Sequence, residues 1–484
     1  MEIKLPEKVI DIVKKFEENN FEIYIVGGAV RDMLTGRRVY DWDFTTNATP
    51  EQMLKMFPEA YYNNEFGTVG IPNEIEGEKP YEITTFRTEK QYDDRRHPKE
   101  VRWGKTLEED LKRRDFTINA MALKLEQESR RVEESKKQKN KTPTLPSFYS
   151  PALPLLYSST LIDLYGGQKD LEKKLIRCVG DPDERFSEDA LRMARAVRIA
   201  AELNFKIEKN TLEAIRKNAS LIKKIANERI RDELFKILAS EHPYEGILLL
   251  KESGLMNIIL PELEKTFGID QVSPNRHHIY DVGTHSLMTL KYTALRNTDP
   301  ITRLASLIHD LGKYHTYKKL ENGTITFYNH EIVGAKIANR IADRLRLSNK
   351  QKDKLYRLVR YHQFTVDERQ TDSAIRRFIR EVGVENIKDM IDIRVGDRLG
   401  SGAKETSWRL EEFKRRLIEV QKQPFTVRDL KIDGNDVMRI LNIKPGPKVG
   451  EVLEYLFEKV VSKKIPNEKE ALIKEVQKMK EELS

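Results

Sequence analysis

The sequence lacks the features that mark secreted and membrane proteins. It has 484 residues but a single cysteine, Cys178, so no disulfide can form within the chain. No apolar run approaches the roughly 18 residues that a membrane-spanning helix needs. The first residues carry charges every few positions, where a secretion signal would have an apolar core. We therefore expect a soluble protein of the cytoplasm, with no membrane partner.

The sequence also has only a small excess of positive over negative charge. The formal net charge is +8 although 34% of the residues are charged, so an anionic partner is permitted but not identified. The 39% of hydrophobic residues suffice for real cores, and the length suggests about three domains.

Residues 1–125 mix helix and strand signals. Apolar residues recur at helical spacing over 7–19, and EIYIVGG, YDWDFTTN, GTVGI and YEITTFR are typical of strands. From 126 to 160 a charged stretch is followed by a segment rich in proline and serine, which predicts a flexible insertion between two strands of one sheet. From 170 onward the pattern is helical, with breaks expected at 180–182, 273–275 and 396–402.

The first chemical cluster lies in IVGGAVRDMLTGRRVYDWDF. Asp41 and Asp43 are one residue apart in an expected strand, so both carboxylates would point to one face. Paired carboxylates suit Mg²⁺ with a nucleoside triphosphate. Gly28 and its neighbour allow close approach of a phosphate, and Arg31 would reach the same group. A D-x-D alone is common at solvated strand ends, and only its combination with GG-x-x-RD favours a site.

These motifs resemble the nucleotidyltransferase head of the class II tRNA nucleotidyltransferases, a family that includes the bacterial poly(A) polymerases. Four further blocks follow in the order of that family, at 113–123, 163–171, 188–205 and 228–238. The resemblance implies an α+β fold in which a small head with a mixed or antiparallel sheet precedes all-helical neck, body and tail domains. The implied boundaries are 1–170 for the head, 171–265 for neck and body, 266–412 for a further helical domain and 420–484 for the tail.

The resemblance also assigns roles within EDALRMARAVR. Cytosine and adenine both present an amino donor beside a ring-nitrogen acceptor, so an aspartate paired with an arginine would select them. In this family that pair corresponds to Asp189 and Arg192. The spacing of these charged residues would equally suit a row of ion pairs along the surface of a helix. The resemblance further implies that the following residues contact nucleotide phosphate or ribose: Gly28, Arg31, Arg114, Arg195 and Arg198.

Two features of the head bear on the product and on the metal. The segment 87–112, which the family associates with the switch from C to A, has its full length and argues against a CC-only enzyme. Glu82 would lie on a strand facing the D-x-D pair. Glu82 could equally well be a third carboxylate of the metal site or an ordinary cross-strand partner.

A second cluster consists of histidines. Seven of the nine histidines fall between 277 and 362, and GTHSL, LIHDLGK and RVGDRLG resemble the motifs of the HD phosphohydrolase superfamily. That resemblance implies a site for Ni, Mn, Fe or Zn on His285, His309, Asp310 and Asp397. His330 and His362 would permit a second ion. The alternative is a relic bundle whose histidines and carboxylates satisfy one another.

The carboxyl-terminal segment resembles the tRNA-binding tail of the nucleotidyltransferase family. It offers lysines for phosphates at 444, 448, 463 and 464. Taken together, the resemblances imply template-independent addition of CCA to the 3′ end of tRNA from CTP and ATP. The alternatives are an A-only enzyme, a poly(A) polymerase, and an HD-type hydrolase of nucleotide or RNA-end phosphates.

Overall fold

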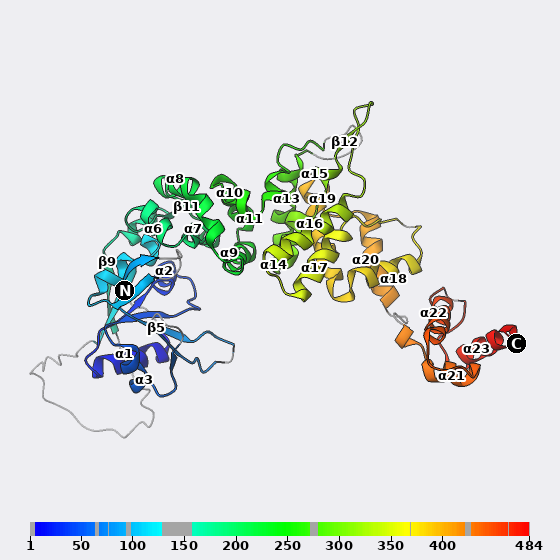
Figure 1. Ribbon diagram of the computed structural model, residues 1–484, viewed down its shortest axis with the longest axis horizontal. Helices are drawn as coiled ribbons and strands as arrows, with labels where there is room; N and C mark the ends of the chain where they lie inside the picture. The colour runs from blue at the N-terminus through cyan, green and yellow to red at the C-terminus, as the bar shows by residue number, and fades with distance from the viewer. Residues whose placement is uncertain are drawn as a thin grey trace, which may run out of the picture. The chain divides into compact units, whose positions relative to one another are not determined.

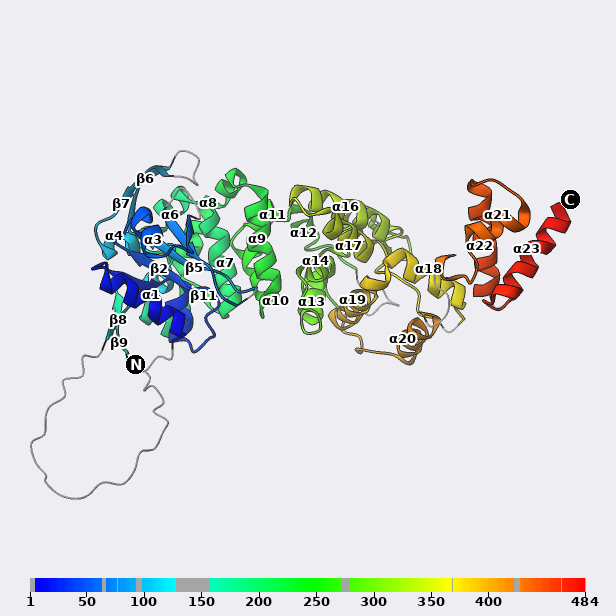
Figure 2. The same cartoon turned by 90° about the horizontal axis from the view of Figure 1, so that it is seen from below.

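The computed structural model describes residues 5–62, 67–75, 77–92, 98–127, 157–271, 279–367, 369–421, 427–462 and 464–483. The chain forms two compact units (Figures 1 and 2), the first comprising Met1–Ile237 with Leu249–Ile258 and the second Leu238–Leu248 with Ile259–Ser484. The finer division into four domains stays a prediction. Within the described ranges, no helix is long and apolar enough to cross a membrane.

The first unit contains a seven-stranded mixed sheet with the strand order β3-β4-β5-β2-β1-β8-β9. Only β2 and β5 pair in parallel among these neighbours. The strands are β1 (Ile23–Val26), β2 (Asp43–Thr46), β3 (Tyr61–Tyr62), β4 (Thr68–Ile71), β5 (Tyr81–Thr85), β8 (Met121–Gln127) and β9 (Tyr157–Asp163). The four strands expected from the sequence correspond to β1, β2, β4 and β5, and the mixed sheet confirms the predicted α+β head.

Helices pack on this sheet through apolar faces. Helix α1 (Glu7–Glu18) buries Val9, Ile12, Val13 and Phe16, as its periodicity predicts. The other short helices of the head are α2 (Gly28–Leu34), α3 (Pro50–Met56), α4 (Leu107–Lys112) and α5 (Gly167–Glu172). Strands β6 (Arg87–Tyr92) and β7 (Pro98–Trp103) pair as a separate antiparallel hairpin, so the segment expected to act in the switch from C to A contains a β-ribbon followed by α4.

The predicted insertion lies between neighbouring strands, but its bounds were too wide. Strand β8 runs to Gln127 and β9 begins at Tyr157, and the two pair antiparallel over seven residues. Residues 126–127 and 157–160 therefore belong to the sheet, because the ladder continues beyond the change in composition. The rest of the insertion lies outside the described residues.

Helices make up the remainder of the first unit. They are α6 (Pro182–Glu188), α7 (Leu191–Leu203), α8 (Lys209–Asn218), α9 (Asn227–Ala239), α10 (Pro243–Glu252) and α11 (Met256–Ile259). Part of α10 and the last residues of α9 and α11 are assigned to the second unit. Two short strands, β10 (Leu175–Ile176) and β11 (Lys206–Ile207), pair in parallel. The predicted continuous helix over 188–205 is wrong at its start. Asp189 is extended (φ −136°, ψ 104°) and ends α6, so it does not belong to the helix that carries Arg192.

The second unit is a helical bundle in which α13 (Val282–Ala294) packs closely on α19 (Ile387–Gly400) and α16 (His330–Arg344) packs on α17 (Asn349–Arg360). Its other elements are α12 (Pro261–Glu264), α14 (Pro300–Ile308), α15 (Lys313–Thr316), β12 (Lys318–Lys319), β13 (Ile325–Thr326), α18 (Asp372–Val382) and α20 (Trp408–Gln421). The break expected at 273–275 lies outside the described residues.

The break expected around 396–402 lies only at the end of that range, because α19 continues through Gly396 to Gly400 and is followed by Ser401 and by Gly402, which has a φ of +80°. A Cβ at Gly396 would lie 2.1 Å from Oγ1 of Thr293, and one at Gly400 would lie 2.9 Å from the backbone nitrogen of Thr289. These glycines therefore permit close contact between α19 and α13 and do not end the helix.

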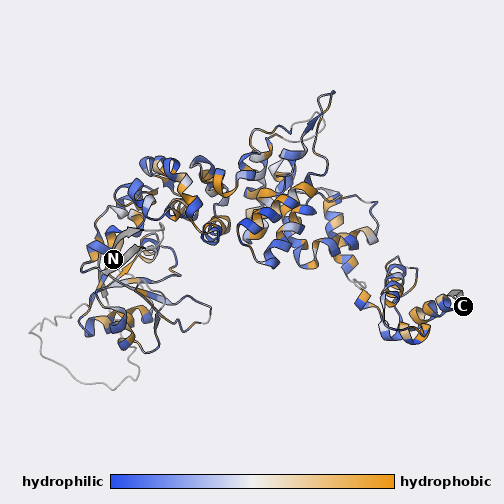
Figure 3. Cartoon of the chain, in the orientation of Figure 1, coloured by the Kyte–Doolittle hydropathy of each residue, from blue (hydrophilic) through white to orange (hydrophobic). Residues whose placement is uncertain are grey.

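The last elements, α21 (Gly434–Leu441), α22 (Pro447–Val461) and α23 (Lys469–Leu483), gather around an apolar cluster that includes Val437, Leu456, Phe457 and Leu472. Figure 3 shows the corresponding alternation of hydrophobic and hydrophilic residues along these helices. The helical tail agrees with the pattern read from the sequence.

Candidate functional sites

The D-x-D carboxylates lie at the edge of strand β2. Asp43 is the first residue of the strand and pairs in register with Glu82 on β5. Burial, with the nearby charge of Asp41, raises the pKa of Asp43 to about 6, and Glu82 adds to the rise. Asp41 is half-exposed and forms an ion pair with Lys79. The charges of Asp41 and Glu82 both act on Asp43, and a divalent cation bound to the D-x-D pair would offset this repulsion.

Gly27 and Arg114 form the wall beside these carboxylates. Gly27 has a φ of +72°, and a Cβ there would lie 3.1 Å from NH1 of Arg114 and 3.3 Å from Oδ2 of Asp43. Only glycine fits such a position without strain. Asp110 accepts a hydrogen bond from Arg114 at 3.0 Å. Burial would raise the pKa of Asp110, but Arg113 and Arg114 lower it to about 2.

A polar network connects this site to helix α7. Arg31 donates to Oδ1 of Asn119 at 3.0 Å, and the Asn119 amide donates to Asp115 at 3.1 Å. Asp115 also accepts two hydrogen bonds from Arg195, at 2.6 and 2.8 Å. Burial alone would raise the pKa of Asp115, but Arg195 holds it well below its ordinary value. Asp115 and Asn119 were missed as site residues, although both lie in the block at 113–123 whose only predicted member was Arg114.

The predicted base-selecting residues occupy the junction of α6 and α7. Asp189 accepts from the backbone N–H of Leu191 at 3.0 Å and from Arg229 at 3.3 Å. Arg192 is buried and donates to Glu188 at 2.7 Å and to the carbonyl of Arg113 at 3.0 Å. Both side chains therefore have protein partners, and their role in reading a base stays a prediction.

Arg198 lies nearly two turns beyond Arg192 on α7, where it pairs with Glu233 at 2.6 Å and with Glu202 at 2.9 Å. Gly28 begins α2 beside Arg31, with room for a Cβ 3.4 Å from NH2 of that arginine. Gly28, Arg31 and Arg114 thus lie around the D-x-D pair. Arg195 and Arg198 of α7 instead form ion pairs.

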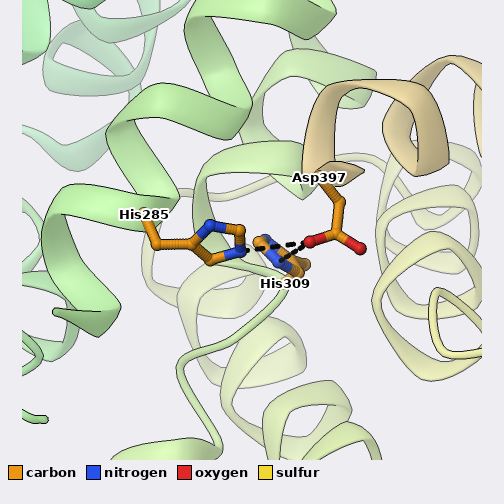
Figure 4. Close-up of side chains that lie close together, drawn as sticks. All are labelled: His285, His309 and Asp397. Atoms are coloured by element: carbon orange, nitrogen blue, oxygen red, sulfur yellow. Dashed lines mark ion pairs between the residues drawn. The ribbon is translucent and has the colours of Figure 1, made fainter. Parts of the chain in front are cut away.

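The second unit brings the predicted histidine cluster together. His285 lies on α13, Asp397 on α19, and His309 with Asp310 follows α14. Nε2 of His285 is 3.1 Å from Oδ1 of Asp397 and 3.4 Å from Oδ2 of Asp310. Figure 4 shows the rings of His285 and His309 turned toward Asp397, with Nε2 of His309 3.9 Å from Oδ1 of Asp397. Asp397, whose distance in sequence leaves its alignment open, joins the cluster.

His330 and His362 join the same cluster from the other side of Asp310. Their Nε2 atoms lie 3.3 and 3.6 Å from Oδ1 of Asp310 and 3.3 Å from each other. The Oδ2 atom of the same carboxylate is 3.1 Å from Nε2 of His309. Two overlapping groups suit a metal by their spacing, one of His285, His309 and Asp397 and one of His309, Asp310 and His362.

Backbone carbonyls determine which nitrogen of three of these rings is free to bind a cation. Nδ1 of His309, His330 and His362 lies 2.8, 2.9 and 2.7 Å from the carbonyl oxygens of Ser306, Phe327 and Val359 respectively. A carbonyl only accepts, so each Nδ1 carries the proton and, in the neutral ring, each Nε2 presents a lone pair. Facing lone pairs 3.3 Å apart repel, and a metal between them removes the repulsion. The residues fit a transition metal.

A cavity of about 490 Å³ opens over this cluster. Its lining includes Lys313, which is buried and lies 2.6 Å from Oδ2 of Asp310, and Arg394, which lies 3.5 Å from Oδ2 of Asp397. Two cationic side chains beside the histidine cluster suit an anionic ligand. Neither had been singled out from the sequence, although Lys313 stands in the LIHDLGK motif.

Of the tail lysines, Lys444, Lys448 and Lys464 are exposed, as phosphate contacts require, and Lys463 lies outside the described residues. Exposure is equally typical of solvated lysines, so their role stays a prediction.

Comparison with known families agrees with this arrangement. The family described as the poly A polymerase head domain matches residues 23–135, and a probable RNA- and SrmB-binding site of polymerase A matches 204–267. A putative second domain of tRNA nucleotidyltransferases matches 324–476.

Similar proteins extend over nearly the whole chain. The CCA-adding enzyme of Ligilactobacillus salivarius is 31% identical over 484 residues, which cover 98% of this chain and 97% of that enzyme. The structure of the Bacillus stearothermophilus CCA-adding enzyme in complex with CTP has a TM-score of 0.64 and 25% identity, covering 98% and 97% of the two chains. A Thermotoga maritima CCA-adding enzyme complexed with tRNA shares the fold, with a TM-score of 0.56 at 20% identity. The chain belongs to the family of CCA-adding enzymes.

Proposed function

We propose that this protein adds CCA to the 3′ end of tRNA from CTP and ATP and releases pyrophosphate. The observation that carries the proposal is the likeness to CCA-adding enzymes over nearly the full length of both chains, together with an intact D-x-D pair. The cytoplasm is the location we predict for this activity.

Asp41 and Asp43 would hold Mg²⁺, with Glu82 beside them as a third carboxylate. Bound there, the ion would offset the negative charge of the triphosphate at the point where the RNA 3′-hydroxyl attacks the α-phosphate. Arg114 extends this positive field, because Asp110 holds its guanidinium next to Gly27 and Asp43. The pKa of Asp43, about 6, leaves its carboxylate ionised at neutral pH.

Asp189 and Arg192 would select the base. The carboxylate would accept from the exocyclic amine, and the guanidinium would donate to the ring nitrogen, a pairing that fits cytosine and adenine but not guanine or uracil. To do so, each side chain exchanges a protein partner for the base. Asp189 would give up Arg229, the longer of its two contacts.

Three tRNA transcripts test this activity: one ending before CCA, one ending after CC and one complete. Each is incubated with Mg²⁺ and CTP, ATP or both, and the products are resolved to one nucleotide. Addition of three residues to the shortest transcript, stopping there, supports CCA addition. Extension of the CC-ending transcript alone would indicate an A-only enzyme, and long A tracts would indicate a poly(A) polymerase.

A second activity is favoured by the histidine cluster. The three rings whose Nδ1 protons are held by backbone carbonyls present Nε2 to Asp310, as metal ligands require. His285, His309, Asp310 and Asp397 would hold Mn, Ni, Fe or Zn, and His330 with His362 would extend the site to a second ion. Such a site activates water against a phosphoester, and Lys313 with Arg394 would orient the phosphate.

Two measurements test this second activity. One is analysis of bound metal, and the other is an assay of the hydrolysis of p-nitrophenyl phosphate and of nucleotides with 2′- or 3′-phosphates. The full chain is purified and dialysed against Mn²⁺ or Ni²⁺. Bound metal with metal-dependent hydrolysis supports the assignment. A metal-free, inert cluster would make it a structural relic.

A further inference from the structure

A second pocket adjoins the histidine cavity. It has a volume of about 360 Å³, and Arg394 lines both cavities. The guanidinium of Arg394 lies over the ring of Phe364, 5.4 Å from its centroid, and 3.5 Å from Oδ2 of Asp397. Arg394 therefore stands at the boundary of the two cavities, between Phe364 and Asp397.

The lining of the second pocket is cationic. It contains three arginines, Arg394, Arg398 and Arg409, and none of its lining residues is acidic. Asp367 lies close enough for its charge to interact with Arg409, and its side chain accepts hydrogen bonds from Arg369 at 2.8 and 3.0 Å. Arginine forks match phosphate oxygens in geometry and charge, so the pocket suits a phosphate-bearing ligand.

The same pocket contains an exposed aromatic surface. Trp408 begins helix α20 and is 64% exposed, and the guanidinium of Arg409 lies 5.2 Å from its ring centroid. Arg398 donates to the carbonyls of Lys404 and Thr406, at 3.1 and 3.4 Å, and so holds the segment that leads into Trp408. An indole face next to arginines is the arrangement on which bases of single strands stack.

We propose that this pocket binds single-stranded nucleic acid next to its phosphorylated end, so that the end enters the histidine cavity while a neighbouring nucleotide stacks on Trp408. This inference rests on the proposed hydrolytic activity of the histidine site and makes it more specific. The substrate class becomes a strand with a terminal phosphate ester, because a free mononucleotide has no neighbouring nucleotide to stack on Trp408.

Trp408 supplies a readout that does not depend on catalysis. The sequence has three tryptophans, at positions 42, 103 and 408. In a full-length chain with Trp42→Phe and Trp103→Phe, fluorescence reports on Trp408 alone. A short oligoribonucleotide ending in a 3′-phosphate is titrated into this protein, and we expect saturable quenching. A DNA strand of the same sequence tests whether the sugar matters.

Arg409→Ala in the same background is expected to weaken strand binding by roughly 5- to 100-fold, in line with the contribution of one stacking and cation–π contact. Arg415→Ala is the matched control, since Arg415 lies on the same helix, outside the pocket, paired with Glu412 and Glu419. It should bind the strand as the parent does.

Two results would overturn the proposal: equal affinity of the Arg409→Ala and Arg415→Ala proteins, or the same quenching by a mononucleotide at equal affinity. Failure of the hydrolytic activity is recognised separately. It appears as absence of metal and of p-nitrophenyl phosphate hydrolysis in the parent protein, whereas failure of the pocket leaves both intact.

Discussion

The carboxylate site of the head and the histidine site of the second unit, both predicted to bind a cation, differ in how their side chains are held. In the head, Asp41 is half-exposed and pairs with Lys79, a partner that a metal would replace. In the second unit, the ring nitrogens are buried and their tautomers are set by backbone carbonyls. We therefore predict that the head binds its cation along with a large substrate and that the histidine site holds a resident metal.

The variants with the largest expected effect test whether the two sites act independently. Asp41→Ala with Asp43→Ala should lower nucleotide addition by about a thousandfold or more, because charge stabilisation at the triphosphate is lost. The assay is incorporation on the CC-ending transcript. His309→Ala with Asp310→Ala is the counterpart and should leave addition unchanged. Loss of one activity in both double variants would contradict a two-site protein.

A smaller effect should separate a preformed metal site from a relic. His330→Ala with His362→Ala removes two nitrogens that face Asp310, and we expect the affinity for Co²⁺ to fall roughly 10- to 100-fold, in view of what ligand-shell changes cost. Visible absorption of bound Co²⁺ measures it. His315→Ala, an exposed histidine near the site, is the control. Unchanged Co²⁺ spectra in the double variant would exclude these rings as ligands.

The exchangeable protein partners of the predicted base-selecting residues lead to a third prediction. Asp189→Ala removes the acceptor for the exocyclic amine, so discrimination of CTP and ATP against UTP and GTP should fall by about 5- to 150-fold, corresponding to about 1–3 kcal/mol. Competition between nucleotides on one transcript measures it. Asp183→Ala changes an acidic residue of α6, the helix that Asp189 follows, and should not alter selection because Asp183 is paired with Lys217. If Asp189→Ala keeps its selectivity, other residues read the base.

The smallest effect concerns the backbone contact beneath the histidine site. In Gly396→Ala the added methyl meets Thr293 of α13, and we expect a loss of about 1–3 kcal/mol in the free energy of unfolding together with weaker metal binding. Gly450→Ala, in helix α22 with open space around it, should stabilise by about 0.5–1 kcal/mol. Urea denaturation compares the two. Equal effects would show that α13 and α19 do not depend on this contact.

Local sequence was sufficient for much of the fold. Four strands of the head, helix α1 and the helical tail follow from periodicity, whereas the β6–β7 hairpin does not. The D-x-D pair and the HD motif name most members of the two predicted sites. Local sequence did not predict the role of Gly396, which was expected to break a helix but lies inside one. A glycine inside a helix signals either an end or a close neighbour, and only the position of α13 distinguishes them.

The residues themselves determined which chemistry is present: paired carboxylates with a glycine turn in one region, imidazoles with carboxylates in another. The tertiary structure alone decided how they meet. It ended α6 at Asp189 so that this residue lies outside the following helix, placed Asp115 between Asn119 and Arg195, and directed Nε2 of three histidines at one carboxylate. Such contacts join segments distant in sequence, and their distances depend on how helices and strands pack, which no local pattern contains.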